Sequence, residues 1–273
     1  MAESSRRAAD PLHRALALAT AALAEAPAGL LTDFDGTLSP IVADPATSRL
    51  VDGAASTLEA LAGRLAVVAI VTGRAPLDAR RMTGVPGLLV AGNHGMEWLE
   101  PGADGPTSSP QAARVRGALA AVLAAVPALP GVTIEDKGLS ATIHYRNAAD
   151  PEVARRAVVA ALPDLGSRGE LELRPGRMSL ELRPIGLGDK GAATRAIIER
   201  FGLRGAVVMG DDTTDLDMFA AVAERRDAGL LHGVIIGVGG DAGEAPAAVA
   251  EAADVVLRDP AEAAALLAAL ADA

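Results

Sequence analysis

Short apolar runs that alternate with helical segments constrain the fold of this chain more than any other feature. The run at residues 65–71 (LAVVAIV) is hydrophobic throughout, which is typical of a strand buried on both faces of a parallel sheet. Similar runs occur at 30–32, 88–90, 206–209 and 233–238, and helical segments follow several of them. Strand, helix, strand in this order predicts βαβ units. We therefore expect an α/β protein with a Rossmann-like parallel sheet.

The pattern changes after residue 100. A polar loop rich in Gly, Pro and Ser (PGADGPTSSP, 101–110) comes first. Two helical segments then alternate with two hairpins whose polar and apolar residues alternate, so that each hairpin has one polar face. This order predicts a smaller α+β domain at 104–184, inserted into a discontinuous core domain formed by 1–103 and 185–273.

Two aspartates follow the first apolar run directly, in the sequence LLTDFDGTL at 30–38. Asp33 and Asp35 are expected at the carboxyl end of a parallel strand, where open α/β sheets place their ligands, and Gly36 permits a sharp turn. Carboxylates this close repel one another unless a cation neutralises them. One interpretation is an Asp nucleophile beside an Asp acid/base, with Mg²⁺ bridging to a phosphate. The alternative, which a lone D-x-D motif favours, is an Asx turn.

Three later places at strand ends or helix starts carry residues suited to phosphoryl transfer: Thr72, Gly73, Arg74, Lys190, Asp211, Asp212 and Asp215. The threonine and the next two amides offer neutral donors for phosphate oxygens. The lysine offers a mobile positive charge, and the aspartates offer oxygen ligands for a hard cation. Each has an ordinary alternative, namely a strand-to-helix turn, a solvated lysine and a helix cap. Their joint occurrence in this order favours phosphoryl transfer.

Composition excludes several classes of function. The net charge of −10 argues against a nucleic-acid partner, because there is no basic surplus to neutralise phosphates. Aromatic residues make up 2% of the chain, too few for base-stacking platforms. Cysteine is absent, so thiol nucleophiles, thiolate metal sites and disulfides are excluded.

The N-terminal region has two interpretations. Arg6 and Arg7 before the apolar run at 15–24 loosely resemble a secretory signal. Asp10 and Pro11, followed by leucines at helical spacing, instead favour a capped helix with one apolar face. We prefer the helix and, with no run suited to a membrane span, expect a cytoplasmic protein that has no membrane partner and is a monomer.

The motifs DFDGTL, VTGR, GDKG and GDDTTD, in this order, resemble the four motifs of magnesium-dependent phosphatases in the haloacid dehalogenase (HAD) superfamily. The inserted domain resembles the α/β cap of a sugar-phosphatase subgroup. Within it, AGNHGME, EDKGLSATIHYR and MSLELRP, at 91–97, 135–146 and 178–184, resemble segments of trehalose-6-phosphate phosphatases. The resemblance implies that the chain hydrolyses the small-molecule sugar phosphate trehalose 6-phosphate, with Mg²⁺.

The resemblance also implies a role for each motif residue. Asp33 would attack phosphorus to form an aspartyl-phosphate, and Asp35 would protonate the leaving sugar oxygen and then activate water. The phosphate group would be held by Thr72, Gly73, Arg74 and Lys190. The metal would be bound by Asp33, the Asp35 carbonyl and Asp211, with Asp212 and Asp215 around them. Leu216 follows Asp215 where the family usually has Glu.

Sugar recognition is expected from polar residues of the cap and of the neighbouring core loop, because each buried sugar hydroxyl needs a charged or amide partner. The candidates are Asn93, His94, Gly95, Glu135, Lys137, His144, Arg146 and Glu181. For Glu135 and Arg146 the alternative is ordinary cross-strand ion pairing, and for His144 it is a structural hydrogen bond.

Two rival functions remain open. The first is a phosphatase of the same fold for another sugar phosphate, such as sucrose 6-phosphate, mannosyl-3-phosphoglycerate or glucosyl-3-phosphoglycerate. The second is a non-catalytic sugar-phosphate sensor, which would have no need of a nucleophile at Asp33.

Overall fold

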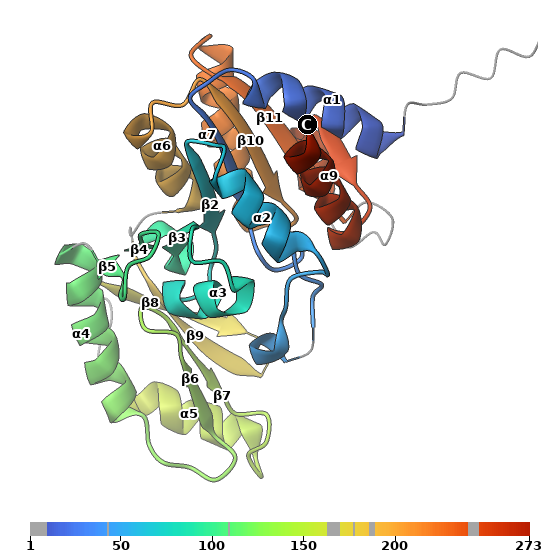
Figure 1. Ribbon diagram of the computed structural model, residues 1–273. Coiled ribbons are helices and arrows are strands. Elements are labelled where there is room, and N and C mark those ends of the chain that lie inside the picture. The colour runs from blue at the N-terminus through green and yellow to red at the C-terminus, as the bar shows by residue number, and fades with distance from the viewer. Residues whose placement is uncertain are drawn as a thin grey trace, which may run out of the picture. The chain divides into compact units, whose positions relative to one another are not determined.

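The structure, a computed structural model, describes residues 10–42, 44–108, 110–162, 170–176, 178–185, 189–239 and 246–273. The chain forms two compact units (Figure 1). Unit 1 comprises Met1–Pro106 and Gly188–Ala273, and unit 2 comprises Thr107–Leu187. Unit 1 is therefore built from two separate stretches of chain, whereas unit 2 is continuous.

The core of unit 1 is a predominantly parallel sheet. Its strands lie in the order β12 (Val255–Leu257), β11 (His232–Val238), β10 (Gly205–Gly210), β1 (Ala28–Thr32), β2 (Val67–Val71), β3 (Leu89–Gly92) and β4 (Glu97–Leu99). All neighbours pair in parallel except β3 and β4. In the register, Leu30 pairs with Val207 on one side and with Val68 on the other. The first aspartate motif therefore follows a strand that has a parallel neighbour on each side.

Helices cover both faces of this sheet. The helices of unit 1 are α1 (Pro11–Leu23), α2 (Ala54–Ala62), α3 (Pro76–Thr83), α6 (Lys190–Arg200), α7 (Leu216–Asp227), α8 (Ala247–Ala252) and α9 (Pro260–Asp272). One apolar cluster packs Leu30 against α1, α2, α3 and α9, of which α1, α2 and α9 are seen together in Figure 1. The other packs Leu31 against α6, α7 and α8. Neighbouring strand residues thus serve opposite faces, as a pleated strand requires.

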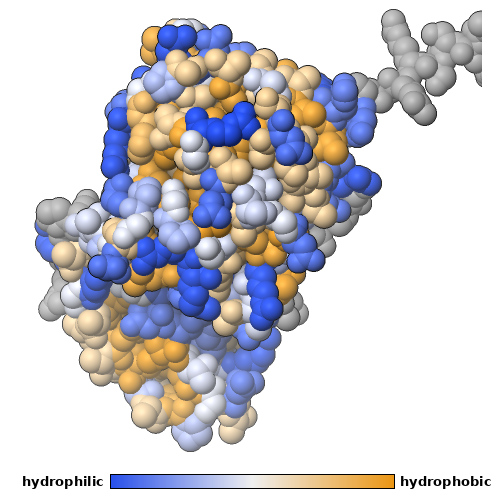
Figure 2. Space-filling model, in the orientation of Figure 1, coloured by the Kyte–Doolittle hydropathy of each residue, from blue (hydrophilic) through white to orange (hydrophobic). Residues whose placement is uncertain are grey.

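Among the described residues of unit 1 there are also three short 3₁₀ helices: η1 (Pro45–Thr47), η2 (Asn93–Gly95) and η3 (Thr213–Asp215). The two core clusters consist almost entirely of Ala, Val, Leu, Ile and Met, with Phe34 and Phe219 as the fully buried aromatics. On the face seen in Figure 2, hydrophobic residues are scattered among hydrophilic ones, which is usual for a protein surface. Across the described ranges, the helices are all too short or too polar to cross a membrane.

Unit 2 is a four-stranded antiparallel sheet with helices. After β5 (Thr107–Ser108) and α4 (Pro110–Ala125) come β6 (Thr133–Asp136), β7 (Ala141–His144), α5 (Pro151–Ala161), β8 (Leu171–Gly176) and β9 (Ser179–Pro184). The sheet order is β6-β7-β9-β8. Inward residues such as Ile143 and Leu182 are fully buried, while the residues that alternate with them supply a polar face.

The predicted α/β class with a parallel sheet is confirmed. The preferred N-terminal helix is also present, since α1 begins after the N-cap Asp10, whose side chain accepts from the Leu12 amide. Sequence patterns did not indicate β4, β12 or α8, each of six residues or fewer.

Candidate active site

The loop after β1 is folded tightly against the loop after β10. The Asp33 amide donates to the Met209 carbonyl at 3.0 Å. Gly36 has φ +77°, and a Cβ there would lie 1.9 Å from Asp211 Oδ2. Any other residue at position 36 would be strained and would displace the Asp211 carboxylate. The glycine thus allows the two aspartates of different strands to approach.

A lysine and three aspartates form a buried charged cluster at this edge of the sheet. Lys190 begins α6 and is 3% exposed. Its Nζ lies 3.0 Å from Asp33 Oδ2 and 2.7 Å from Asp215 Oδ1. Asp211 Oδ1 accepts a hydrogen bond from the Thr37 hydroxyl at 2.8 Å. The alternative interpretation, in which Lys190 is exposed to solvent, is therefore wrong, because this side chain is buried between carboxylates.

Asp215 has a structural role as well. Its Oδ2 accepts from the backbone amides of Asp211 and Asp212 at 2.9 and 3.0 Å. Together with Asp212 it forms a capping box at η3. The helix cap that was the alternative interpretation of these aspartates is therefore present, in addition to the contact between Asp215 and Lys190. The Asp212 side chain is exposed and accepts from the Thr213 hydroxyl at 3.2 Å.

Burial shifts the pKa values of these groups, and the neighbouring charges add to or oppose the shifts. Burial raises the pKa of Asp33 from 3.8 to about 7, opposed by the charge of Lys190 and reinforced by Asp215 and Asp211. Burial likewise raises the pKa of Asp211 to about 7, against the hydrogen bond from Thr37. Burial lowers the pKa of Lys190, but Asp33 and Asp215 outweigh this and raise it above 10.5. The cluster thus has an excess of negative charge that one lysine does not neutralise.

The donor set fits a hard divalent cation. Asp33, Asp211 and Asp215 each offer a carboxylate oxygen, and the three oxygens lie within 4.8 Å of one another. Asp33 Oδ1 is buried and, within the described part of the chain, has no hydrogen-bond partner. Such orphaned buried oxygens are uncommon, and carboxylate oxygens are what Mg²⁺ prefers. The residues present therefore suit a hard divalent cation beside Asp33.

The Asp35 carboxylate is held outside this cluster by Arg74. Arg74 Nε and Nη2 lie 2.6 Å from Asp35 Oδ2 and Oδ1, and the guanidinium lies over the Phe34 ring, 5.5 Å from its centroid. Ser48 contacts both partners. From sequence, only the Arg74 amide was considered, as a phosphate donor. The structure shows that the Arg74 amide contacts Thr72 Oγ1 at 3.3 Å and that its side chain pairs with Asp35.

The loop Asn93–Gly95 packs against the Thr72–Arg74 turn. Asn93 and His94 have φ values of 49° and 57°. The His94 amide donates to the Thr72 carbonyl at 2.9 Å, and a Cβ on Gly73 would lie 2.9 Å from the His94 ring. The Asn93 side chain is buried and donates to Glu97 at 2.6 Å, so as placed here it is committed to an internal partner.

The cap candidates lie on one face of the sheet of unit 2. The register aligns Glu135 with Thr142, and Thr142 with Glu181, in one row across the strands. Glu135 Oε2 lies 3.3 Å from His144 Nε2 and 3.5 Å from Lys137 Nζ. The structure thus brings these three candidates together. For Glu135, the contacts are those of the alternative interpretation, in which it forms ordinary ion pairs within the sheet.

The remaining cap candidates pair elsewhere or lie at the strand end. Glu181 accepts from Arg183 Nε at 2.9 Å. Arg146 is exposed just after β7. Arg174 stands opposite Glu181 in the register and extends the polar row; its alternation with Leu173 predicts the polar face, but Arg174 was not among the candidates for sugar binding.

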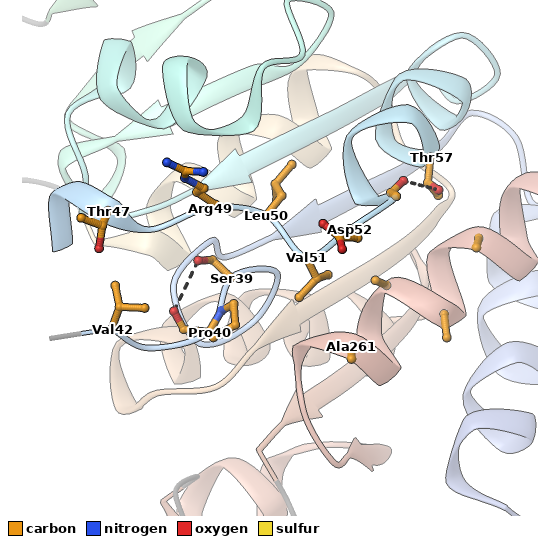
Figure 3. Close-up of a pocket in the computed structure, with 14 residues that line it drawn as sticks. Ser39, Pro40, Val42, Thr47, Arg49, Leu50, Val51, Asp52, Thr57 and Ala261 are labelled. Atoms are coloured by element: carbon orange, nitrogen blue, oxygen red, sulfur yellow. Dashed lines mark hydrogen bonds between the residues drawn. The ribbon is translucent and has the colours of Figure 1, made fainter. Parts of the chain in front are cut away.

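A groove lies apart from the charged cluster. It has a volume of about 770 Å³ and runs between the segment 39–57 and α9 (Figure 3). Alanines of α9 and Leu50 and Val51 make up much of its wall, with Arg49 and Asp52 among the polar residues. None of the acidic cluster residues lines it. The chemistry is therefore assigned to the strand ends and not to this groove.

The two-unit architecture and the acidic cluster after β1 and β10 define a phosphatase fold of the HAD superfamily. Solved structures agree. One is titled a trehalose-6-phosphate phosphatase related protein (27% identity, TM-score 0.64, 88% of this chain and 95% of that chain). Another is trehalose-6-phosphate phosphatase of Aspergillus fumigatus (27% identity, TM-score 0.61, 94% and 97%).

The sequence profile of the trehalose-phosphatase family matches residues 31–245, and the chain belongs to that family. Trehalose-phosphate phosphatase of Mycobacterium avium (strain 104) is 39% identical over 201 residues, covering 70% of this chain and 50% of that protein. The Mycobacterium bovis (strain BCG / Pasteur 1173P2) protein of the same description is 35% identical over 269 residues, covering 92% and 66%.

The chain spans only part of its curated relatives. A Mycobacterium tuberculosis (strain CDC 1551 / Oshkosh) protein described as an uncharacterized glycosyl hydrolase is 40% identical over 200 residues, which is 15% of its length. The match with the M. avium protein likewise covers about half of that protein. Homologous units of this kind thus occur within longer chains.

Proposed function

We propose that this chain is a magnesium-dependent phosphatase that hydrolyses trehalose 6-phosphate to trehalose and phosphate through a phosphorylated Asp33. The observation that carries the proposal is the buried Asp33 carboxylate, in a chain of the trehalose-phosphatase family. One of its oxygens is held by Lys190 at 3.0 Å and the other has no partner in the described structure. The lysine thus positions the carboxylate that would act as the nucleophile, while the oxygen without a partner is available to a cation.

The proposed reaction has two steps. An Asp33 oxygen forms a bond to phosphorus while the bond between phosphorus and the sugar oxygen breaks. The sugar oxygen keeps the electron pair of the broken bond and receives a proton from Asp35. In the second step, Asp35 accepts a proton from water as the water oxygen attacks phosphorus and releases Asp33. Lys190, Thr72 and the amides of Gly73 and Arg74 hold the phosphoryl oxygens, since positioning and charge stabilisation provide most of the catalysis in such transfers.

The proposed Mg²⁺ ligands are Asp33, the Asp35 carbonyl and Asp211, with Asp212 and Asp215 around them; an oxygen of Asp215 lies within 4.8 Å of the Asp33 and Asp211 oxygens. When bound, the ion supplies positive charge against the phosphate and the carboxylates. The raised pKa values of Asp33 and Asp211 are compatible with this assignment, because they show that burial, with a smaller contribution from neighbouring carboxylates, disfavours the charged forms, which a bound cation would stabilise.

We propose that unit 2 is the cap that recognises the sugar. The polar row of Glu135 and Glu181, with Lys137, His144 and Arg146, offers both donors and acceptors for hydroxyl groups. His94 and Gly95 are proposed as the core-side contacts, with Asn93 holding their loop through its bond to Glu97. A cytoplasmic location and a monomeric state remain proposals, testable by fractionation and by light scattering.

Phosphate release from a panel of sugar phosphates tests the function. Trehalose 6-phosphate, sucrose 6-phosphate, mannosyl-3-phosphoglycerate and glucosyl-3-phosphoglycerate are each assayed with Mg²⁺ and with EDTA. We expect the highest kcat/KM for trehalose 6-phosphate, loss of activity in EDTA, and recovery on adding excess Mg²⁺. A higher value for another ester would reassign the substrate. Binding without turnover of any ester would indicate a sensor.

A further inference from the structure

Ser48 is a buried serine that no sequence motif marks. It is 4% exposed and follows η1 directly. Its Oγ lies 3.1 Å from Asp35 Oδ1 and 2.9 Å from Arg74 Nη2. Arginine can only donate, so Ser48 accepts from Arg74 and its single hydroxyl proton goes to Asp35. The three side chains form a closed triangle.

Within this triangle, the two carboxylate oxygens of Asp35 accept different numbers of hydrogen bonds. Oδ1 accepts from Arg74 Nη2 at 2.6 Å and also from Ser48. Oδ2 accepts from Arg74 Nε at 2.6 Å. Because a carboxylate oxygen offers about two lone-pair sites, the described contacts saturate Oδ1 and leave a site open on Oδ2.

Backbone contacts fix Ser48 relative to the Asp35 turn. The Gly36 amide donates to the Ser39 carbonyl at 2.7 Å, and the Val51 amide donates to the Leu38 carbonyl at 3.0 Å. Asp44 caps η1 by accepting from the Ala46 amide at 3.0 Å. The segment that carries Ser48 is thereby tied to the loop that carries Asp35, so the hydroxyl is held in place and does not depend on a freely rotating surface loop.

We propose that Ser48 is a positioning residue for the leaving-group step: by saturating Oδ1, it reserves Asp35 Oδ2 as the oxygen that carries the transferred proton. This inference rests on the proposed function. In that reaction the proton leaves Oδ2 for the sugar oxygen as its bond to phosphorus breaks, and the electrons of the O–H bond stay on Asp35. Without the Ser48 hydroxyl, the two carboxylate oxygens become nearly equivalent, and fewer molecules present the proton to the leaving oxygen.

Two phosphate esters with different leaving groups test this role. A sugar alkoxide needs a proton as it leaves, whereas p-nitrophenolate is stable without one. We compare kcat/KM of Ser48→Ala on trehalose 6-phosphate and on p-nitrophenyl phosphate, because kcat/KM reports the steps up to departure of the leaving group. We expect a loss of roughly 10-fold on the sugar ester and less than about 2-fold on the aryl ester, a small part of what a general acid provides.

Matched variants separate positioning from damage to the fold. Thr47→Ala removes the neighbouring hydroxyl, which donates to the Asp44 carbonyl at 2.8 Å, and should leave both kcat/KM values unchanged. Ser48→Thr keeps a hydroxyl and should recover the sugar ester. Melting temperatures of all variants report folding, and the ratio between the two esters remains decisive even if threonine is not tolerated.

Equal losses on both esters, or no loss on either, would overturn the role of Ser48 while leaving the proposed function standing. A wrong proposed function would be recognised differently, because the protein without any substitution would then release no phosphate from the sugar ester.

Discussion

Lys190 permits several carboxylates to be buried together after β1 and β10. Its ammonium contacts Asp33 and Asp215 at 3.0 and 2.7 Å. A buried ion pair of this kind contributes little net stability, since desolvation offsets much of the attraction. Its presence is better explained by function, because perturbed pKa values gather where charged groups are needed for chemistry. Because Lys190 keeps its contact with Asp215 when Asp33 is replaced, the role of Asp33 in activity can be separated from the stability of the fold.

Asp33→Asn tests this separation. The amide keeps the size of the carboxylate but removes the nucleophilic charge, so we expect phosphate release to fall by at least about 10³-fold. The circular dichroism spectrum should be unchanged and the melting temperature close to that of the parent. Asp44→Asn, at an exposed cap that asparagine can also fill, is the matched control and should retain activity. Substantial hydrolysis by Asp33→Asn would remove Asp33 from the nucleophile role.

In the sheet of unit 2, one face is packed and stabilises the fold, whereas the other face is polar and is available for binding. The row on β6, β7 and β9 is polar and runs from exposed Glu135 over buried Thr142 to partly buried Glu181, while the other face of the sheet carries buried residues such as Ile143 and Leu182. Exposed ion pairs such as Glu135 with Lys137 stabilise a sheet weakly. They are therefore free to exchange their partners for sugar hydroxyls at little cost to the fold.

Lys137→Ala and Glu181→Ala should act on substrate choice. We expect kcat/KM for trehalose 6-phosphate to fall about 10-fold or more, because a partner for a buried hydroxyl is lost, while hydrolysis of p-nitrophenyl phosphate stays within about 2-fold. Arg155→Ala, which removes an exposed contact to Glu152 on α5, serves as the control. Parallel losses on both esters would place Lys137 and Glu181 outside the sugar site.

The pair of Glu100 and Arg200 links the end of β4 to the end of α6 and predicts a pH dependence of stability. Hydrogen bonds from Arg200, at 2.7 and 2.9 Å, lower the pKa of Glu100 below 4.5. The contribution of the Glu100 carboxylate to stability is therefore present above pH 4.5 and is lost as the pH falls through the lowered pKa that Glu100 has in the folded protein.

Glu100→Gln measures that contribution. Both side chains are partly exposed, so we expect a loss of about 0.5 kcal/mol in the free energy of unfolding at pH 7, shrinking toward zero as the pH falls through the lowered pKa of Glu100 in the folded protein. Urea unfolding at a series of pH values checks this, with the exposed Glu251→Gln as control. A difference that grows as the pH falls would contradict the sign.

Sequence patterns predicted the parts of the site that follow strands. Asp33, Asp211 and Asp215 were predicted together because the carboxyl ends of parallel strands share one edge. The triangle of Asp35, Arg74 and Ser48 was not predicted, since Ser48 lies in a segment without periodicity and its contacts are set by tertiary packing. The strands β4 and β12 have three residues each, too few for alternation to be recognised.

At the scale of the whole molecule, unit 1 depends on contacts that are distant in sequence, whereas unit 2 depends on a continuous stretch. Contacts between distant segments form slowly because loop closure must come first. In refolding followed by pulsed hydrogen exchange, we therefore expect amides of β7 and β9 to be protected before those of β1 and β10. Simultaneous protection of all four strands, or earlier protection of β1, would contradict this order.

The central position of β1 also has a consequence during synthesis. The ribosome makes β1, β2 and β3 early, but β10, which covers the other edge of β1, emerges only after all of unit 2. Until then the nascent chain carries fully apolar strands with an open edge, a state prone to aggregation. Production of soluble protein should accordingly depend on chaperones that shield the growing polypeptide until its last third has been translated.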